Sequence, residues 1–182
     1  MQLAHTIVGD RRAPLVVFLH GFLGLREDWR GAVETLGDAY RCLASVLPGH
    51  GVSVARGANV YIMEDATTAV IDLIDTVGAT SFSIIGYSMG GRLALHLAST
   101  YAMRIDALVI ESASPGLRGE TERVERLAQD ERWARLLDRE GMRPFLDAWY
   151  RQPLFASLAA RPELLENLVA GRSGNDPREL AR

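Results

Sequence analysis

Short, mostly apolar runs recur along the first part of the chain, and three of the four end at glycine or proline. They occupy residues 14–21, 41–47, 81–86 and 105–110. A strand buried on both faces of a parallel sheet has this pattern, because helices cover both of its faces. We therefore expect four parallel strands. Residues 3–8 could add one or two antiparallel strands at an edge of the sheet.

Between these runs, apolar positions recur every three or four residues, which is the period of an amphipathic helix. Such stretches cover residues 29–36, 62–77 and 89–101. Strands that alternate with helices predict an α/β fold with a doubly wound, mostly parallel sheet.

After residue 110 the pattern changes to arginine- and glutamate-rich helical stretches. These cover residues 120–137, 143–150 and 162–170. We interpret them as a helical cap and expect a core region over residues 1–114 and a cap region over residues 115–182.

Composition narrows the class of protein. The 182 residues are 48% hydrophobic and 24% charged, with a formal net charge of −3, which fits a globular domain with a real core. No basic cluster or long apolar run suggests nucleic-acid binding or membrane insertion. Cys42 is the only cysteine, so a disulfide framework is excluded and a cytoplasmic location is expected. We expect a small-molecule partner.

A G-x-S-x-G motif joins the third apolar run to the following helix. It reads Gly86-Tyr-Ser88-Met-Gly90. This context is typical of a nucleophile elbow, in which a serine occupies a strained turn between strand and helix. The helix start offers free N–H groups and a positive dipole end to an oxyanion formed near Ser88.

A second motif, His20-Gly21-Phe22, ends the first apolar run. In folds with such an elbow, Phe22 is placed to supply an oxyanion donor through its backbone N–H. For His20 we favour a hydrogen-bonded role bracing this loop over that of a catalytic base. We nevertheless count it among the candidate substrate-binding residues.

The triad partners of an elbow serine follow it in sequence, first the acid and then histidine. The only histidine after Ser88 is His96, which lies in the helix that begins at the elbow and cannot fold back onto its start. Either the missing base and the last core strands lie beyond residue 182 or are replaced by a partner chain, or residues 1–182 alone do not form a triad enzyme. The strand at residues 105–110 would otherwise be an exposed edge open to self-association.

Arg92 lies one helical turn after Ser88, where its charge opposes the helix dipole, so we expect it to meet an anion. The histidines show no metal-ligand spacing, and neither G-x-G-x-x-G nor a P-loop is present. We expect no metal and no organic cofactor.

Through these motifs and Leu47-Pro-Gly-His-Gly51, the chain resembles members of the α/β-hydrolase superfamily. A closer resemblance, to the 2-succinyl-6-hydroxy-2,4-cyclohexadiene-1-carboxylate synthases of menaquinone biosynthesis, rests on longer stretches. They are Gly86–Arg92, Glu111–Leu117, Glu122–Trp133, Asp147–Leu158 and Gly171–Ser173.

The resemblance implies roles for particular residues. Ser88 would be catalytic, with the backbone N–H groups of Met89 and Phe22 as oxyanion donors. The substrate would be bound by arginines and pocket residues, namely Arg92, Arg126, Arg172, Tyr87 and Trp149. The implied reaction is elimination of pyruvate from a polycarboxylated cyclohexene.

Two other functions stay open at this point. One is a serine carboxylic-ester hydrolase on the same fold, which would need no arginine cluster. The other is an inactive fragment that binds small anions or a partner chain.

Overall fold

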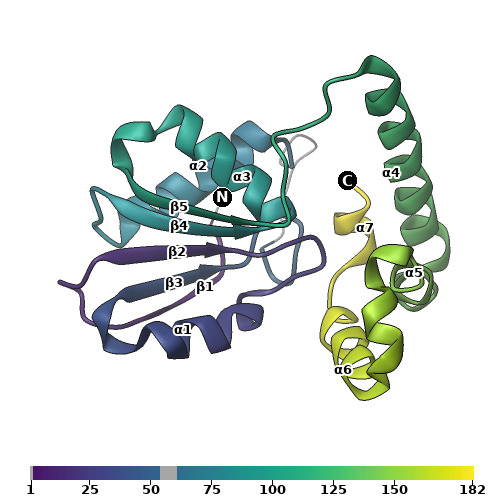
Figure 1. Ribbon diagram of the computed structural model, residues 1–182, viewed down its shortest axis with the longest axis horizontal. Helices are drawn as coiled ribbons and strands as arrows, with labels where there is room; N and C mark the ends of the chain where they lie inside the picture. Colours follow the sequence, from purple (N-terminus) through teal and green to yellow (C-terminus); the bar gives the residue numbers. More distant parts are fainter. Residues whose placement is uncertain (1, 54–60) are drawn as a thin grey trace. The chain divides into compact units, whose positions relative to one another are not determined.

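The computed structural model describes residues 2–53 and 61–182 and divides the chain into two compact units, Met1–Gly116 and Leu117–Arg182. The first unit contains a five-stranded sheet in the order β1-β3-β2-β4-β5 (Figure 1). Its strands are β1 (His5–Val8), β2 (Leu15–Leu19), β3 (Arg41–Ser45), β4 (Phe82–Tyr87) and β5 (Ile105–Glu111). β1 pairs antiparallel with β3, and the other pairings are parallel. The four predicted parallel strands are confirmed, with one antiparallel strand from residues 3–8.

Helices cover both faces of this sheet. They are α1 (Arg30–Leu36), α2 (Met63–Thr76) and α3 (Met89–Thr100), with short 3₁₀ turns η1 (Arg26–Trp29), η2 (Gly37–Ala39) and η3 (Ala102–Arg104). Figure 1 shows α2 and α3 on one face and α1 on the other. The doubly wound arrangement expected from the alternating pattern is therefore present.

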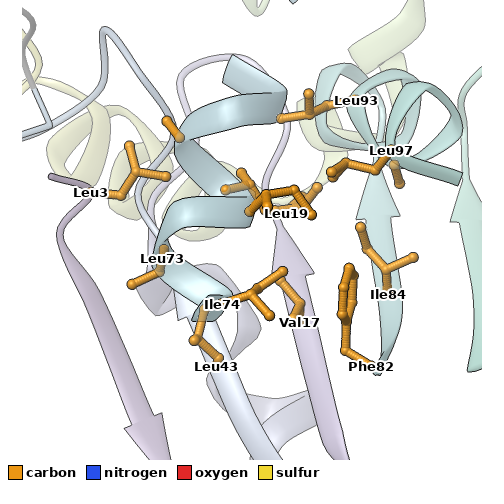
Figure 2. Packing of buried hydrophobic residues seen from close by; sticks show 14 of the residues in the cluster. Leu3, Val17, Leu19, Leu43, Leu73, Ile74, Phe82, Ile84, Leu93 and Leu97 are labelled. Carbon is orange, nitrogen blue, oxygen red and sulfur yellow. The ribbon is translucent and has the colours of Figure 1, made fainter. Parts of the chain in front are cut away.

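Alternate residues of β2 build two separate cores. Val17 and Leu19 pack with α2 and α3 in the larger cluster, part of which Figure 2 shows. Val16 and Phe18 point to the opposite face, where their partners include Trp29 of η1 and two apolar residues of α1. All of β2 is buried, and a fully buried side chain of this size contributes about 1.5–3 kcal/mol. The paired cores hold the carboxyl end of β2 rigidly.

The smaller cluster also contains Cys42, which is 1% exposed. Burial raises the pKa of its thiol, because the charged thiolate would lose its hydration. The side chain therefore acts as a small apolar core group.

The second unit is helical. Its elements are α4 (Glu120–Glu140), α5 (Met142–Trp149), η4 (Pro153–Ala160), α6 (Pro162–Arg172) and α7 (Pro177–Leu180). Ring contacts tie three of them together. The ring of Trp149 stacks on Phe145 with centroids 5.4 Å apart, meets Trp133 edge-on at 5.3 Å and lies 6.1 Å from Phe155. The three helices expected over residues 120–137, 143–150 and 162–170 are present, and η4 and α7 are additional.

β5 forms one edge of the sheet, beside β4. The side chains of Leu108 and Val109 on this strand are 36% and 52% exposed. Across residues 2–53 and 61–182, no helix combines the length and apolar character needed to cross a membrane.

Candidate active site

Ser88 lies between the end of β4 and the start of α3, with φ 51° and ψ −113°. A non-glycine residue with positive φ is strained, and neighbouring elements hold it there. The Ser88 N–H donates to the carbonyl of Glu111 at 2.9 Å, and the Arg92 N–H donates to the carbonyl of Ser88 at 3.1 Å. The elbow predicted from the motif is thus fixed from both sides.

The glycines around Ser88 are required by close contacts. A Cβ atom on Gly86 would lie 2.5 Å from the Gly90 oxygen, and one on Gly90 would lie 2.2 Å from the Leu19 oxygen. One on Gly91 would lie 2.6 Å from the Cβ of Ala113. Each distance is far below van der Waals contact. Glycine at these positions lets α3 begin directly against the ends of β2 and β4.

The loop that follows β2 packs against the elbow. A Cβ atom on Gly21 would lie 2.8 Å from Cδ1 of Tyr87 and 3.3 Å from Cβ of Ser88. Phe22 is the next residue of this loop, and Met89 is the first residue of α3, where backbone N–H groups have no partner within the helix. The structure therefore brings Ser88 together with the two segments that carry the predicted oxyanion donors.

His20 supports this loop with its ring. Its Nε2 accepts from the Leu47 N–H at 2.9 Å, and its Nδ1 lies 2.8 Å from the Gly21 carbonyl oxygen. The side chain is 1% exposed, and neither ring nitrogen is left for a substrate. These contacts support the expected role of His20 in bracing the loop, and its place among the substrate-binding residues stays a prediction.

His50 has a matching role that the sequence did not reveal. Its Nε2 accepts from the Leu23 N–H at 3.1 Å, so it supports the same loop from the turn after β3. The spacing of the histidines along the sequence argues only against a metal-ligand role for it. The signal available was its place in Leu47-Pro-Gly-His-Gly51, directly after a buried strand, but the bond depends on β3 lying beside β2.

Tyr87 and Arg92 flank Ser88 on the elbow. Tyr87, the last residue of β4, is 40% exposed. Arg92 is exposed in the first turn of α3. Among residues 2–53 and 61–182, no acidic side chain pairs with its guanidinium. The expected anion is thus not supplied by the described part of the chain, and the cation faces solvent near the elbow.

No base for Ser88 is found in the part of the chain that the structure describes, where its Oγ makes no hydrogen bond. The ring of His96 is instead bonded through Nδ1 to Thr67 Oγ1 on α2, at 2.8 Å. His5 Nδ1 lies 3.0 Å from the Leu3 carbonyl oxygen at the start of β1. With His20 and His50 also bonded elsewhere, the elbow and the oxyanion segments are assembled without a histidine at Ser88.

The remaining candidate residues belong to the second unit. Nε of Arg126 lies 2.9 and 2.8 Å from the two carboxylate oxygens of Asp130, one turn further along α4. Arg172 is half-buried at the end of α6, and Trp149 is half-buried in the aromatic cluster. Within the described ranges, no group of three or more His, Cys, Asp or Glu side chains could hold a metal ion.

Comparison with known proteins agrees with the elbow and the sheet. Residues 14–173 match the family described as alpha/beta hydrolase fold, and the chain belongs to this family. The full chain is 36% identical to the 2-succinyl-6-hydroxy-2,4-cyclohexadiene-1-carboxylate synthase of Salmonella paratyphi C and covers 70% of it. The same chain therefore belongs to the family of these synthases.

Two further relatives show how far the likeness extends. The structure of MenH from S. aureus superimposes with a TM-score of 0.90 at 30% identity, over 97% of this chain and 68% of that one. The protein PHYLLO, chloroplastic, of Arabidopsis thaliana is 32% identical over 87% of this chain, which spans only 10% of PHYLLO. The predicted fold and the closer resemblance are both confirmed.

Proposed function

We propose that the protein is a carbon–oxygen lyase of menaquinone biosynthesis. It eliminates pyruvate from 2-succinyl-5-enolpyruvyl-6-hydroxy-3-cyclohexene-1-carboxylate and releases 2-succinyl-6-hydroxy-2,4-cyclohexadiene-1-carboxylate. Family membership supports this reaction. The observation that carries it is Arg92, an exposed cation without an acidic partner in the described residues, one turn from the elbow serine. A site for simple esters has no need of such a cation.

The substrate's charges match the proposed binding residues. It carries several carboxylates, and arginine binds a carboxylate through paired, charge-assisted hydrogen bonds. Arg92 is the proposed ligand on the sheet unit, and Arg126 and Arg172 are the proposed ligands on the helical unit. Tyr87 and Trp149 are proposed as further substrate-binding residues.

The elimination begins at a carbon next to the succinyl ketone. A base removes the proton, and the electron pair moves onto the ketone oxygen as an enolate. As the carbonyl re-forms, the pair shifts through the ring and breaks the bond between the ring and the enolpyruvyl oxygen. The group leaves as the enolate of pyruvate and becomes pyruvate by taking up a proton, which balances the proton removed by the base. The N–H groups of Phe22 and Met89 would stabilise the enolate, and one such donor contributes about 2.7–4 kcal/mol.

Ser88 is proposed to accept the proton rather than to form an acyl-enzyme. Its Oγ is the reactive side-chain atom presented at the turn between β4 and α3. For this role its hydroxyl needs a hydrogen-bonded base, which the four histidines of this chain do not supply.

The test is pyruvate release by the protein at its natural full length, followed by coupled oxidation of NADH. The wild type should release one pyruvate per substrate, and Ser88→Ala should lower kcat on the order of 10⁴-fold. Arg92→Ala should lower kcat/KM by about 10²-fold through loss of a carboxylate contact. Arg143→Ala, which removes an exposed ion pair on α5, is the control and should leave both constants unchanged.

Other outcomes would favour the other functions. Hydrolysis of a p-nitrophenyl ester that needs Ser88 but is indifferent to Arg92→Ala, with no pyruvate release, would identify an ester hydrolase. Carboxylate binding measured by calorimetry without turnover of either substrate would identify a binding protein.

A further inference from the structure

Two buried histidines face each other beneath the loop that carries Phe22. His20 begins this loop after β2, and His50 lies in the turn after the neighbouring strand β3. They are 1% and 3% exposed. Their ring centroids are 4.9 Å apart with an edge-on geometry. The loop and the turn are therefore joined through two rings that solvent does not reach.

The bonds between the two segments are reciprocal. The Leu47 N–H in the turn donates to Nε2 of His20 at 2.9 Å, and the Leu23 N–H in the loop donates to Nε2 of His50 at 3.1 Å. Each bond spans 27 residues. Each histidine thus supports the segment to which the other belongs.

The partners assign one tautomer to each ring. An amide N–H can only donate, so both Nε2 atoms carry a lone pair. A carbonyl oxygen can only accept, and Nδ1 of His20 lies 2.8 Å from that of Gly21, while Nδ1 of His50 lies 3.0 Å from that of Pro48. Both rings are therefore neutral with the proton on Nδ1. A second proton would place an N–H against an N–H.

These bonds fix the peptide planes on both sides of Phe22. The Gly21 carbonyl and the Phe22 N–H belong to one planar trans peptide, so they point in opposite directions. His20 donates to that carbonyl and thereby sets the direction of the Phe22 N–H. The next peptide contains the Leu23 N–H, which His50 holds. Leu23 itself has a φ of 67°, a strained value for a side chain of its size.

We propose that His20 and His50 are a pair of positioning residues that aim the Phe22 N–H at the oxyanion. Neither ring takes part in proton transfer. This role rests on the proposed function for its effect on turnover, whereas the tautomers and the restraint on the loop are properties of the folded protein. The Phe22 ring also meets the His50 ring edge-on, with centroids 5.8 Å apart. His50 therefore contacts the side chain of Phe22 and also binds the backbone N–H of the next residue, Leu23.

The first test uses NMR on the natural full-length protein and needs no turnover. Long-range proton–nitrogen spectra should show both rings protonated on Nδ1 alone. In His50→Leu, amide exchange at Leu23 should rise by about tenfold or more beyond the change seen in the control, because its acceptor is gone. In His50→Gln, Oε1 replaces the Nε2 acceptor, and protection should return.

The control is His96→Leu, which removes a half-buried histidine bond between α2 and α3 without touching the loop. It corrects for loss of stability alone. A wild-type ring protonated on Nε2, or unchanged Leu23 exchange in His50→Leu, would overturn the proposal even if elimination is confirmed. The wild-type spectra decide the matter where a variant fails to fold.

The second test separates kcat from KM in pyruvate release. His50→Leu should lower kcat by about 10²-fold with little change in KM, because the oxyanion forms only during reaction. His50→Gln should recover most of this loss.

For His20, asparagine keeps a hydrogen-bond donor near the position of Nδ1, whereas leucine has none. The kcat of H20N should therefore be higher than that of H20L. Equal losses in H50L and H50Q would refute an effect on catalysis. Absence of elimination in the wild type, with the NMR result as stated, would refute the proposed function alone.

Discussion

At the elbow, a Cβ atom on Gly90 would lie 2.2 Å from the oxygen of Leu19 and 2.5 Å from that of His20. Both neighbours are backbone atoms at the carboxyl end of β2, which is buried along its whole length. They cannot move without shifting the strand that leads into the Phe22 loop. A single methyl group here would therefore disturb stability and site geometry together.

We expect Gly90→Ala to lower the free energy of unfolding by about 1–3 kcal/mol, the usual cost of overpacking, and to reduce turnover. Urea denaturation followed by circular dichroism measures the first effect. Gly31→Ala on α1 is the matched control, because a Cβ atom there meets nothing within 4 Å. It should raise stability by about 0.5–1 kcal/mol through the higher helix propensity of alanine. Equal effects of the two substitutions would contradict the contact argument.

At the scale of elements, periodic patterns predicted the sheet and the long helices closely. The pattern over residues 62–77 became α2, Met63–Thr76, because its apolar positions lie on the helix face that the sheet buries. The eight residues of η4 are almost wholly apolar and carry no period. Their conformation depends on contacts such as Phe155 against Tyr150, which lie beyond the reach of a local pattern. α7 has only four residues and is capped by Asp176.

The candidate site also has parts that the local sequence predicts and parts that it does not. The elbow and the His20-Gly21-Phe22 loop are predictable, because the strain and the close contacts demand particular residues at fixed spacing. The bond from Leu23 to His50 was not predictable, since it depends on the order in which strands pair. The G-x-S-x-G motif alone does not specify which residue acts as the base for Ser88, because that depends on contacts between residues far apart in the sequence.

Arg104 shows how one side chain can join elements. It precedes β5, and its guanidinium donates to Asp75 at 2.7 Å and to the carbonyls of Ala79 and Thr80 at 2.8 and 3.1 Å. These three bonds fasten the end of α2 and the turn before β4 to the start of β5. The guanidinium also lies 5.8 Å from the centre of the Phe82 ring. We therefore expect Arg104 to stabilise the packing of these elements against one another, which a solvated surface charge would not do.

We expect Arg104→Ala to lower the free energy of unfolding by about 1.5–3 kcal/mol, the range for hydrogen bonds to a charged group. Arg135→Ala, which removes an exposed pair with Glu131 on α4, should cost less than about 0.5 kcal/mol. Chemical denaturation of both variants compares the two. A cost for Arg104→Ala no larger than that of the control would show that these bonds merely replace bonds to water.

For the whole molecule, the exposed edge of the sheet is the feature with the widest consequence. β5 is paired only on its β4 side within the described residues, and Leu108 and Val109 lie exposed on it. An open edge presents backbone donors and acceptors as well as apolar side chains, so another strand can add to it. We expect the chain of residues 1–182 to self-associate through this strand at micromolar concentration.

Val109→Lys should weaken that association, because a charge on an edge strand opposes pairing with a second strand. Sedimentation velocity over a range of protein concentrations measures it. Met103→Lys is the matched control: it adds the same charge and removes a larger apolar group that is 97% exposed, but it lies in η3 outside the strand. If association is driven by general surface hydrophobicity, Met103→Lys should reduce it at least as much. If it runs along the backbone of β5, only Val109→Lys should shift the distribution toward monomer, and a wild-type chain that sediments as a monomer throughout would contradict both mechanisms.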